Sequence, residues 1–243
     1  MALAGSLLFW AFMLVTSVLL FPIALLIRVV TFPFDRRLAF LHTFSCFWAS
    51  LYTWCNPLWS VRIGGKEHID RHAAYVMVCN HQSLVDILVL FRLFVHFKWV
   101  SKSENFRIPF VGWNMTLNRY IRIDRGRIRG NLSMMRRAET ALEAGSSVMI
   151  FPEGTRSAGG ALGEFKLGAF ELAIRSGRPI LPIVVHGTAA ALPRRGFILR
   201  GKHAIRIRVL EPISPPWAPG ADAETLRTLA HGRIAGELDR EPG

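Results

Sequence analysis

The first 27 residues carry no charged side chain, and this run restricts the chain more than any other feature. An apolar helix of about 20 residues is long enough to cross the roughly 30 Å hydrocarbon core of a bilayer. The run lacks the basic start and the small-residue cleavage site of a signal peptide. It therefore predicts a membrane-inserted helix. Arg28, Arg36 and Arg37 follow it directly and predict that this end faces the cytoplasm.

An aromatic-rich segment comes next. Its apolar side chains recur at three- and four-residue spacing, which predicts a helix. The rings suit the boundary between headgroups and hydrocarbon, although a helix buried in the protein core would show the same spacing. We expect residues 1–60 to form a two-helix membrane element that either spans the bilayer or enters one leaflet. The recurring residues are Phe40, Phe44, Phe47, Leu51, Cys55 and Leu58, with Trp48, Tyr52, Trp54 and Trp59 between them.

Residues 61–243 show short apolar runs that alternate with helical stretches. Runs rich in Val and Ile predict strands at 74–79, 98–101, 120–123, 147–151, 180–185 and 205–210. Helices are expected at 84–94, 131–143, 165–175 and 222–238. This alternation predicts an α/β domain with a mixed, largely parallel sheet flanked by helices.

The net charge of +13 predicts an acidic partner. Anionic lipid headgroups, phosphorylated small molecules and nucleic acid would each fit. The mean hydropathy is positive, which favours a membrane surface over nucleic acid. The three cysteines form no CxxC pair, so we expect reduced core thiols rather than disulfides or zinc.

A histidine and an aspartate stand five residues apart where the strand predicted at 74–79 meets the next helix. His81 would lie in the loop, with Ser83 capping the helix and Asp86 in its first turn. A carboxylate placed there can fix the imidazole tautomer and leave the other ring nitrogen free to accept a proton. Alternatively, Asp86 only caps the helix. A metal site would need a third nearby ligand, so no metal is expected.

A tight turn that carries a carboxylate and a guanidinium follows the strand predicted at 147–151. Gly154 permits a positive φ or a close backbone approach, and the planar fork of Arg156 suits a phosphate. Glu153 would orient Arg156 or accept a hydrogen bond from a substrate hydroxyl. A general base beside an anion-binding turn indicates acyl transfer to the hydroxyl of a phosphorylated acceptor.

These residues resemble the glycerolipid acyltransferase family, and most closely the 1-acylglycerol-3-phosphate acyltransferases. The resemblance covers roughly residues 60–190 and rests on ordered blocks. The blocks are Asn80-His81-x4-Asp86; Lys102, Pro109, Gly112 and Ile123-Asp124-Arg125; Phe151-Pro152-Glu153-Gly154-Thr155-Arg156-Ser157; Phe165-Lys166-Leu167-Gly168-Ala169-Phe170; and Leu181-Pro182-Ile183-Val184.

The resemblance implies transfer of a fatty acyl chain from acyl-CoA or acyl carrier protein to a lysophospholipid, without a cofactor. His81 would be the general base and Asp86 its partner. The phosphorylated acceptor would be bound by Lys102, Arg125, Glu153, Gly154, Thr155 and Arg156. The family also implies an anionic membrane as partner and an active site on its cytoplasmic side, with no role for nucleic acid.

Other acceptors and activities remain open. Asn105 replaces the usual Leu of the second block, and Arg119 and Arg122 intrude before its end. The acceptor could therefore be another lyso-lipid, such as a lyso-aminolipid, or glycerol 3-phosphate. A thioesterase would use the same base with water, and a basic membrane- or nucleic-acid-binding protein would need neither pair of residues.

Overall fold

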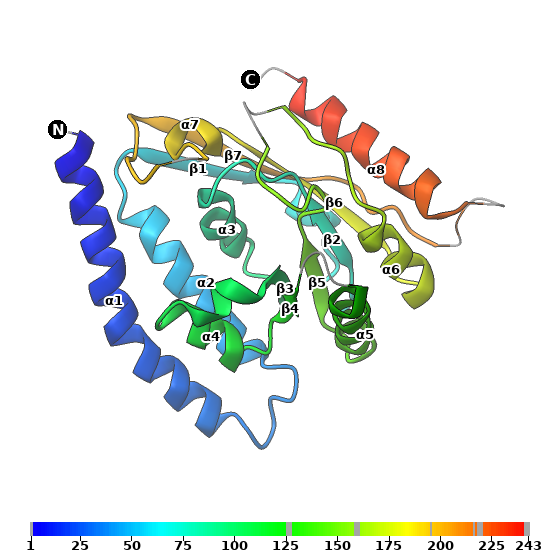
Figure 1. Ribbon diagram of the computed structural model, residues 1–243, viewed down its shortest axis with the longest axis horizontal. Coiled ribbons are helices and arrows are strands. Elements are labelled where there is room, and N and C mark those ends of the chain that lie inside the picture. Colours follow the sequence, from blue (N-terminus) through cyan, green and yellow to red (C-terminus); the bar gives the residue numbers. More distant parts are fainter. Residues whose placement is uncertain are drawn as a thin grey trace.

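The computed structural model describes residues 2–124, 128–157, 161–194, 196–215, 217 and 221–240. Its centre is a seven-stranded sheet in the order β1-β7-β6-β2-β5-β3-β4 (Figure 1). Neighbouring strands are parallel except β6 and β7, which are antiparallel. The sequence-based prediction of a mixed, largely parallel sheet is confirmed. The strands are β1 (Trp59–Gly64), β2 (Val76–Cys79), β3 (Phe97–Lys102), β4 (Ile121–Ile123), β5 (Ser147–Ile150), β6 (Ile180–His186) and β7 (His203–Val209).

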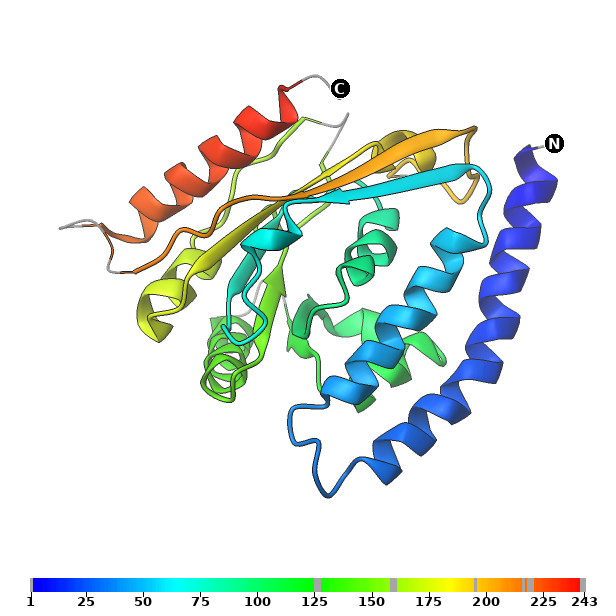
Figure 2. The ribbon, with the colours of Figure 1, turned by 180° about the vertical axis from the view of Figure 1, so that it is seen from behind.

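Helices cover both faces of this sheet (Figures 1 and 2). One face carries α5 (Ile128–Glu143), α6 (Gly168–Ser176) and α8 (Ala223–Leu238). The other carries α2 (Ala39–Trp54), α3 (Val85–Leu90) and α4 (Val111–Leu117), with α1 (Ala2–Val30) outermost. The short helices are α7 (Thr188–Ala191), η1 (Lys66–His68), η2 (Phe91–Leu93) and η3 (Ser103–Arg107).

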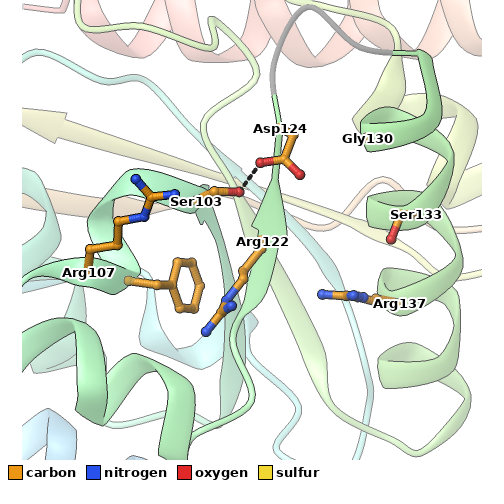
Figure 3. Close-up of a pocket in the computed structure, with 8 residues that line it drawn as sticks. Ser103, Arg107, Arg122, Asp124, Gly130, Ser133 and Arg137 are labelled. Atoms are coloured by element: carbon orange, nitrogen blue, oxygen red, sulfur yellow. Dashed lines mark hydrogen bonds between the residues drawn. The ribbon is translucent and has the colours of Figure 1, made fainter.

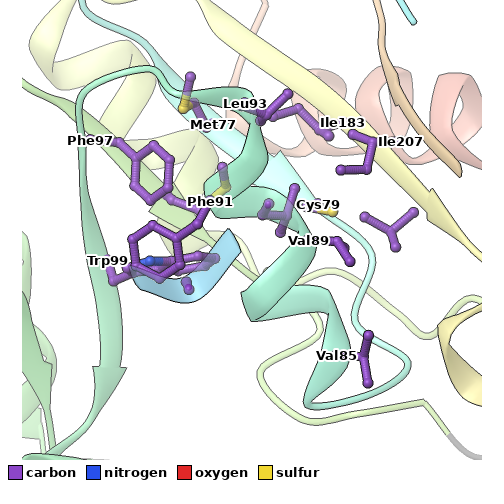
Figure 4. Close-up of a cluster of buried hydrophobic side chains, with 14 of the residues drawn as sticks. Met77, Cys79, Val85, Val89, Phe91, Leu93, Phe97, Trp99, Ile183 and Ile207 are labelled. Carbon is purple, nitrogen blue, oxygen red and sulfur yellow. The ribbon is translucent and has the colours of Figure 1, made fainter. Parts of the chain in front are cut away.

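The central strand β2 explains why two cores form. Its side chains alternate between the faces, so Val76 and Val78 join the core under α5, α6 and α8. Met77 and Cys79 join the core under α2 and α3 (Figure 4). Because both faces are covered, all four residues of β2 are buried, as expected for a strand inside a parallel sheet.

Helix α1 lies along the outside of the molecule and contacts α2 and α4. It is long and apolar enough to cross a membrane by length and composition. Many of its leucines are exposed, including Leu8, Leu14 and Leu19. Two hydrogen bonds hold its first half to a distant loop. The Trp10 indole donates to the Phe197 carbonyl at 2.7 Å, and the Ser6 hydroxyl accepts from the Leu199 amide at 2.9 Å.

Helix α2 has two different sides. Trp48 and Tyr52 are buried between α1 and the domain, as in a core helix. The other side of α2 faces outward. It carries recurring aromatic residues of the sequence pattern, of which Phe40 and Phe47 are exposed and Phe44 is half-buried.

The helix α2 ends at Trp54, and Trp59 begins β1 rather than continuing the helix. The sheet therefore starts two residues before the boundary predicted at residue 61. β1 was missed because Ser60 and Arg62 interrupt its apolar residues, and α4 and α7 were missed because they are short.

A buried cluster of nitrogen-bearing side chains joins α2 to β3. Lys98 is 6% exposed, and its ammonium donates to the carbonyls of Arg37 and Asn118 at 2.7 and 2.9 Å. Burial lowers the pKa of Lys98 to about 7. His42 donates from Nε2 to the Val95 carbonyl, and its pKa is held well below the usual range by burial. His42 is thus a neutral structural residue that anchors the helical layer.

The end of β1 generates a test of the fold. Gly65 has φ +78°, and a Cβ there would lie 1.9 Å from the Val209 carbonyl oxygen. We expect Gly65→Ala to lower the free energy of unfolding by about 2 kcal/mol or more, because strain and overpacking combine. Gly232→Ala is the control, since a Cβ there meets nothing within 4 Å inside α8. The control should stabilise by about 0.5–1 kcal/mol. Equal values in chemical denaturation would contradict this account.

Candidate active site

The predicted site residues gather at the carboxyl ends of the parallel strands, where α/β proteins usually bind ligands. His81 follows β2, the turn at Gly154 follows β5, and Lys102 ends β3. Strand β5 lies between β2 and β3, so the third sequence block sits beside the first and the second block lies one strand further away.

His81 and Asp86 form a direct pair. The His81 Nδ1 lies 2.8 Å from Asp86 Oδ2, and Asp86 is fully buried. Because an ionised carboxylate only accepts hydrogen bonds, Nδ1 carries the proton and Nε2 is left as the acceptor. The imidazole stacks on the Phe151 ring with centroids 3.9 Å apart. The pair therefore has the tautomer and the fixed orientation that a general base needs.

Asp86 also receives hydrogen bonds from three other groups. Its Oδ2 accepts from the backbone amides of Gln82 and Ser83 at 2.6 and 2.8 Å. Its Oδ1 accepts from the Thr188 hydroxyl at the start of α7. The Ser83 amide bond is one half of the expected capping arrangement, although the helix begins two residues later, at Val85. Sequence reasoning missed Thr188, which is 102 positions from Asp86 and has no local signal.

Asn80 fixes the position of this loop. Its side-chain amide donates to the Val185 carbonyl at 2.9 Å, and its side-chain oxygen accepts from the Val185 amide at 2.8 Å. The Asn80 side chain thereby pairs with the backbone of β6 just beyond the end of β2. The Ser83 hydroxyl donates to the Leu192 carbonyl at 2.7 Å, which holds the other end of the loop.

Glu153 points toward the backbone of the histidine loop. Its two oxygens accept from the amides of His81 at 2.7 Å and Gly163 at 3.0 Å. It is 7% exposed, and burial raises its pKa. Among the described residues, Glu153 forms no ion pair with Arg156. These contacts support a role in positioning His81, and the expected contact of Glu153 with substrate stays a prediction.

Four cationic side chains line the same cavity as His81. Lys102 and Arg156 were predicted, whereas Lys166 and Arg194 were not. Gly154 has φ +72°, and a Cβ there would lie 3.0 Å from the Lys166 ammonium. Thr155 accepts a hydrogen bond from Arg194 at 3.2 Å. The glycine thus lets the lysine approach the turn, and the four cationic side chains line one cavity with His81. The predicted Arg125 lies outside the described residues.

The cavity itself has a volume of about 960 Å³ and extends from His81 to the N-terminal helices. Its apolar walls come from α1 and α2 as well as from the domain. They include Phe9, Trp10, Met13, Trp48, Ala49, Tyr52, Leu88, Phe91, Met115 and Met134. One continuous space therefore joins a proton acceptor, a group of cations and a large apolar chamber.

The Thr188 contact gives a test of how Asp86 is held. We expect Thr188→Val to lower the free energy of unfolding by about 1.5–3 kcal/mol, because a buried carboxylate loses one hydrogen bond at nearly constant volume. Thr228→Val on α8 removes an exposed hydroxyl bonded to the Glu224 carbonyl. That control should stay within about 0.5 kcal/mol of the wild type. A Thr188 variant as stable as the control would show that the contact is dispensable.

Comparison with known proteins places the chain among annotated relatives. A family model described as Acyltransferase matches residues 60–186. The chain is 34% identical to a 1-acyl-sn-glycerol-3-phosphate acyltransferase of Chlamydomonas reinhardtii, over 96% of this chain and 68% of that protein. It is 31% identical to the Pseudomonas aeruginosa protein of the same name, over 82% of this chain and 74% of that protein.

A chloroplast protein of the same name from Arabidopsis thaliana is 33% identical over 94% of this chain. The chain spans 61% of the length of that protein. Among solved structures, the crystal structure of the lysophosphatidate acyltransferase from Thermotoga maritima superposes with a TM-score of 0.80. That match covers 100% of both chains at 22% identity, and it shows that the two share a fold.

Proposed function

Since the chain belongs to the acyltransferase family, we propose that it transfers a fatty acyl group from a thioester to the free hydroxyl of 1-acylglycerol 3-phosphate, giving phosphatidic acid. The observation that carries the proposal is the His81–Asp86 pair, which opens into a cavity containing both cations and an apolar chamber. A phosphorylated acceptor needs the cations, and a fatty acyl chain needs the chamber.

In the proposed reaction His81 Nε2 removes the proton from the acceptor hydroxyl as its oxygen attacks the thioester carbonyl. The new C–O bond gives a tetrahedral intermediate, which then expels the thiolate as the C–S bond breaks. The imidazolium returns its proton to the sulfur, so the products are the ester and a free thiol. Asp86 stabilises the imidazolium between these steps and keeps its charge throughout.

The cations at the turn are assigned to the acceptor phosphate. Lys102, Arg156, Lys166 and Arg194 line the cavity together with His81, so a phosphate bound there would bring the nearby glycerol hydroxyl to the histidine. Gly154 and Thr155 shape the turn. Glu153 holds the His81 amide, and its contact with the acceptor stays a prediction.

The membrane is the proposed location of the reaction. Both substrates carry fatty chains, and the exposed leucines of α1 would be stable in hydrocarbon but not in water. Phe40 and Phe47 of α2 are exposed as well. We place the active site on the cytoplasmic side, where acyl-CoA or acyl carrier protein would supply the acyl group.

The role of the histidine is tested by thiol release from palmitoyl-CoA, with and without lysophosphatidate. We expect acceptor-dependent release in the wild type and a loss of about 10²–10⁴-fold in kcat for His81→Ala, the usual contribution of a general base. His72→Ala is the matched control, because His72 is exposed in the loop before β2. Release without acceptor would indicate a thioesterase, and wild-type kcat in the His81 variant would remove the proposed base.

The role of the chamber is tested by narrowing it. Ala49 on α2 lines the cavity and is 7% exposed. We expect Ala49→Leu to lower the ratio of kcat/KM for palmitoyl- over lauroyl-thioester by about tenfold or more, because the longer chain loses space. Ala11→Leu, on the exposed side of α1, should leave the ratio unchanged. An unaltered ratio in both variants would show that the acyl chain binds elsewhere.

A further inference from the structure

A second pocket lies beyond the edge strand β4, apart from the cavity that contains His81 (Figure 3). Its volume is about 390 Å³. The walls come from η3, from β4 with the residue that follows it, and from α5. The lining residues are Ser103, Phe106, Arg107, Arg122, Asp124, Gly130, Ser133 and Arg137. We call it the arginine pocket.

Three arginine side chains line the arginine pocket, each from a different element. Arg107 belongs to η3, Arg122 to β4 and Arg137 to α5 (Figure 3). Within the described parts of the chain, none of the three forms an ion pair. Like charges repel in so small a space, so the arrangement favours an anion that the protein itself does not supply.

The remaining polar groups leave the guanidiniums available. Asp124, the carboxylate among the described lining residues, accepts a hydrogen bond from the Ser103 hydroxyl rather than from an arginine. Arg122 lies over the Phe106 ring at 4.6 Å and donates one bond to Thr116 at 3.0 Å. This contact orients its planar fork and occupies only part of its donor capacity.

The arginine pocket and the catalytic cavity share a thin wall. Lys102 lines the cavity and the next residue, Ser103, lines the pocket. Likewise, Ile123 lines the cavity and the next residue, Asp124, lines the arginine pocket. Strand β4 is three strands from β2 in the sheet, so the pocket lies on the order of 14 Å from His81 at the usual strand spacing.

We propose that the arginine pocket binds the phosphate groups at the nucleotide end of acyl-CoA. The inference rests on the proposed function and adds the binding mode of its donor. The two substrates carry their phosphates differently. The acceptor phosphate is a few bonds from the reacting hydroxyl, so it needs cations beside His81. The phosphates of CoA lie at the far end of the pantetheine arm, away from the thioester. They therefore need a separate basic site, outside the cavity that contains His81.

The shape of the pocket favours a small polyphosphate over a carrier protein. An acidic protein surface would meet a broad basic face, whereas these arginines surround a concavity of about 390 Å³. Arginine forks bind phosphate oxygens in pairs, and CoA presents both a pyrophosphate and a 3′-phosphate. The structure therefore assigns the donor as the CoA thioester.

The test uses the 243-residue protein in detergent and the double variant Arg107→Gln/Arg137→Gln. Both side chains are exposed, so the fold is retained. KM is measured for palmitoyl-CoA, for palmitoyl-pantetheine, for palmitoyl-acyl carrier protein and for lysophosphatidate. We expect KM for palmitoyl-CoA to rise about tenfold or more, because charge-assisted hydrogen bonds are lost. KM for palmitoyl-pantetheine, which has no phosphate, should equal that of the wild type.

The matched control is Arg71→Gln/Arg136→Gln, which removes the same charge. Arg136 is exposed on α5 outside the pocket, and Arg71 precedes β2 at the opposite end of the sheet. The control should bind palmitoyl-CoA like the wild type. An equal rise in its KM would overturn the proposal, since general charge attraction would then explain the effect.

Three further results would overturn the assignment. One is a rise only in KM for lysophosphatidate, which would make this an acceptor site. Another is a loss confined to acyl carrier protein donors, which would make it a protein-docking site. The third is no change with any donor. If the wild type shows no transfer at all, the proposed function fails. Calorimetric titration with CoA alone then tests whether the arginine pocket binds CoA. Binding lost in the pocket variant would support the site, and equal or absent binding would refute it.

Discussion

The buried carboxylate of Asp86 is the interaction on which the site depends. A charge in the interior is tolerated only when hydrogen bonds replace the lost water, and removing its partners leaves a penalty of several kcal/mol. Here the replacement donors come from His81, the two following amides and the distant Thr188. Because these groups belong to the ends of β2 and β6, the carboxylate is satisfied only when those strands are paired.

The order of strands arranges the chemistry along one edge of the sheet. Reading from β2 across β5 and β3 to β4, that edge presents the histidine, the glycine turn, Lys102 and then the arginine pocket. This spatial order differs from the order in the chain, since β5 inserts between β2 and β3. The crossover places Glu153 against the amide of His81, and the Ser157 amide donates to the His81 carbonyl at 2.7 Å, so two hydrogen bonds hold the turn after β5 to the histidine.

Local features of this protein could be predicted from the sequence, and features that depend on strand order could not. The buried strand before His81 and the helix after it have clear patterns, and their spacing predicted the pair with Asp86. Thr188 and Arg194 reach the site only through the folded topology, so no local pattern indicates them. Lys166 belongs to a sequence block that was recognised, but its approach to the turn at Gly154 depends on the fold. The same holds for the role of Glu153, whose partner lies 72 positions away. β1 was missed because Ser60 and Arg62 interrupt its apolar residues and because the aromatic pattern of the preceding helix was extended to Trp59.

Helix α1 has two roles that are usually assigned to separate parts of an enzyme. Its outer side offers leucines to its surroundings, while Phe9, Trp10 and Met13 on its inner side form part of the cavity wall. It also hydrogen-bonds to the loop at Phe197 and Leu199. Deleting the helix would therefore remove part of the cavity wall as well as the apolar outer surface. A more polar form of this enzyme would have to keep the helix and replace the exposed leucines on its outer side with polar residues.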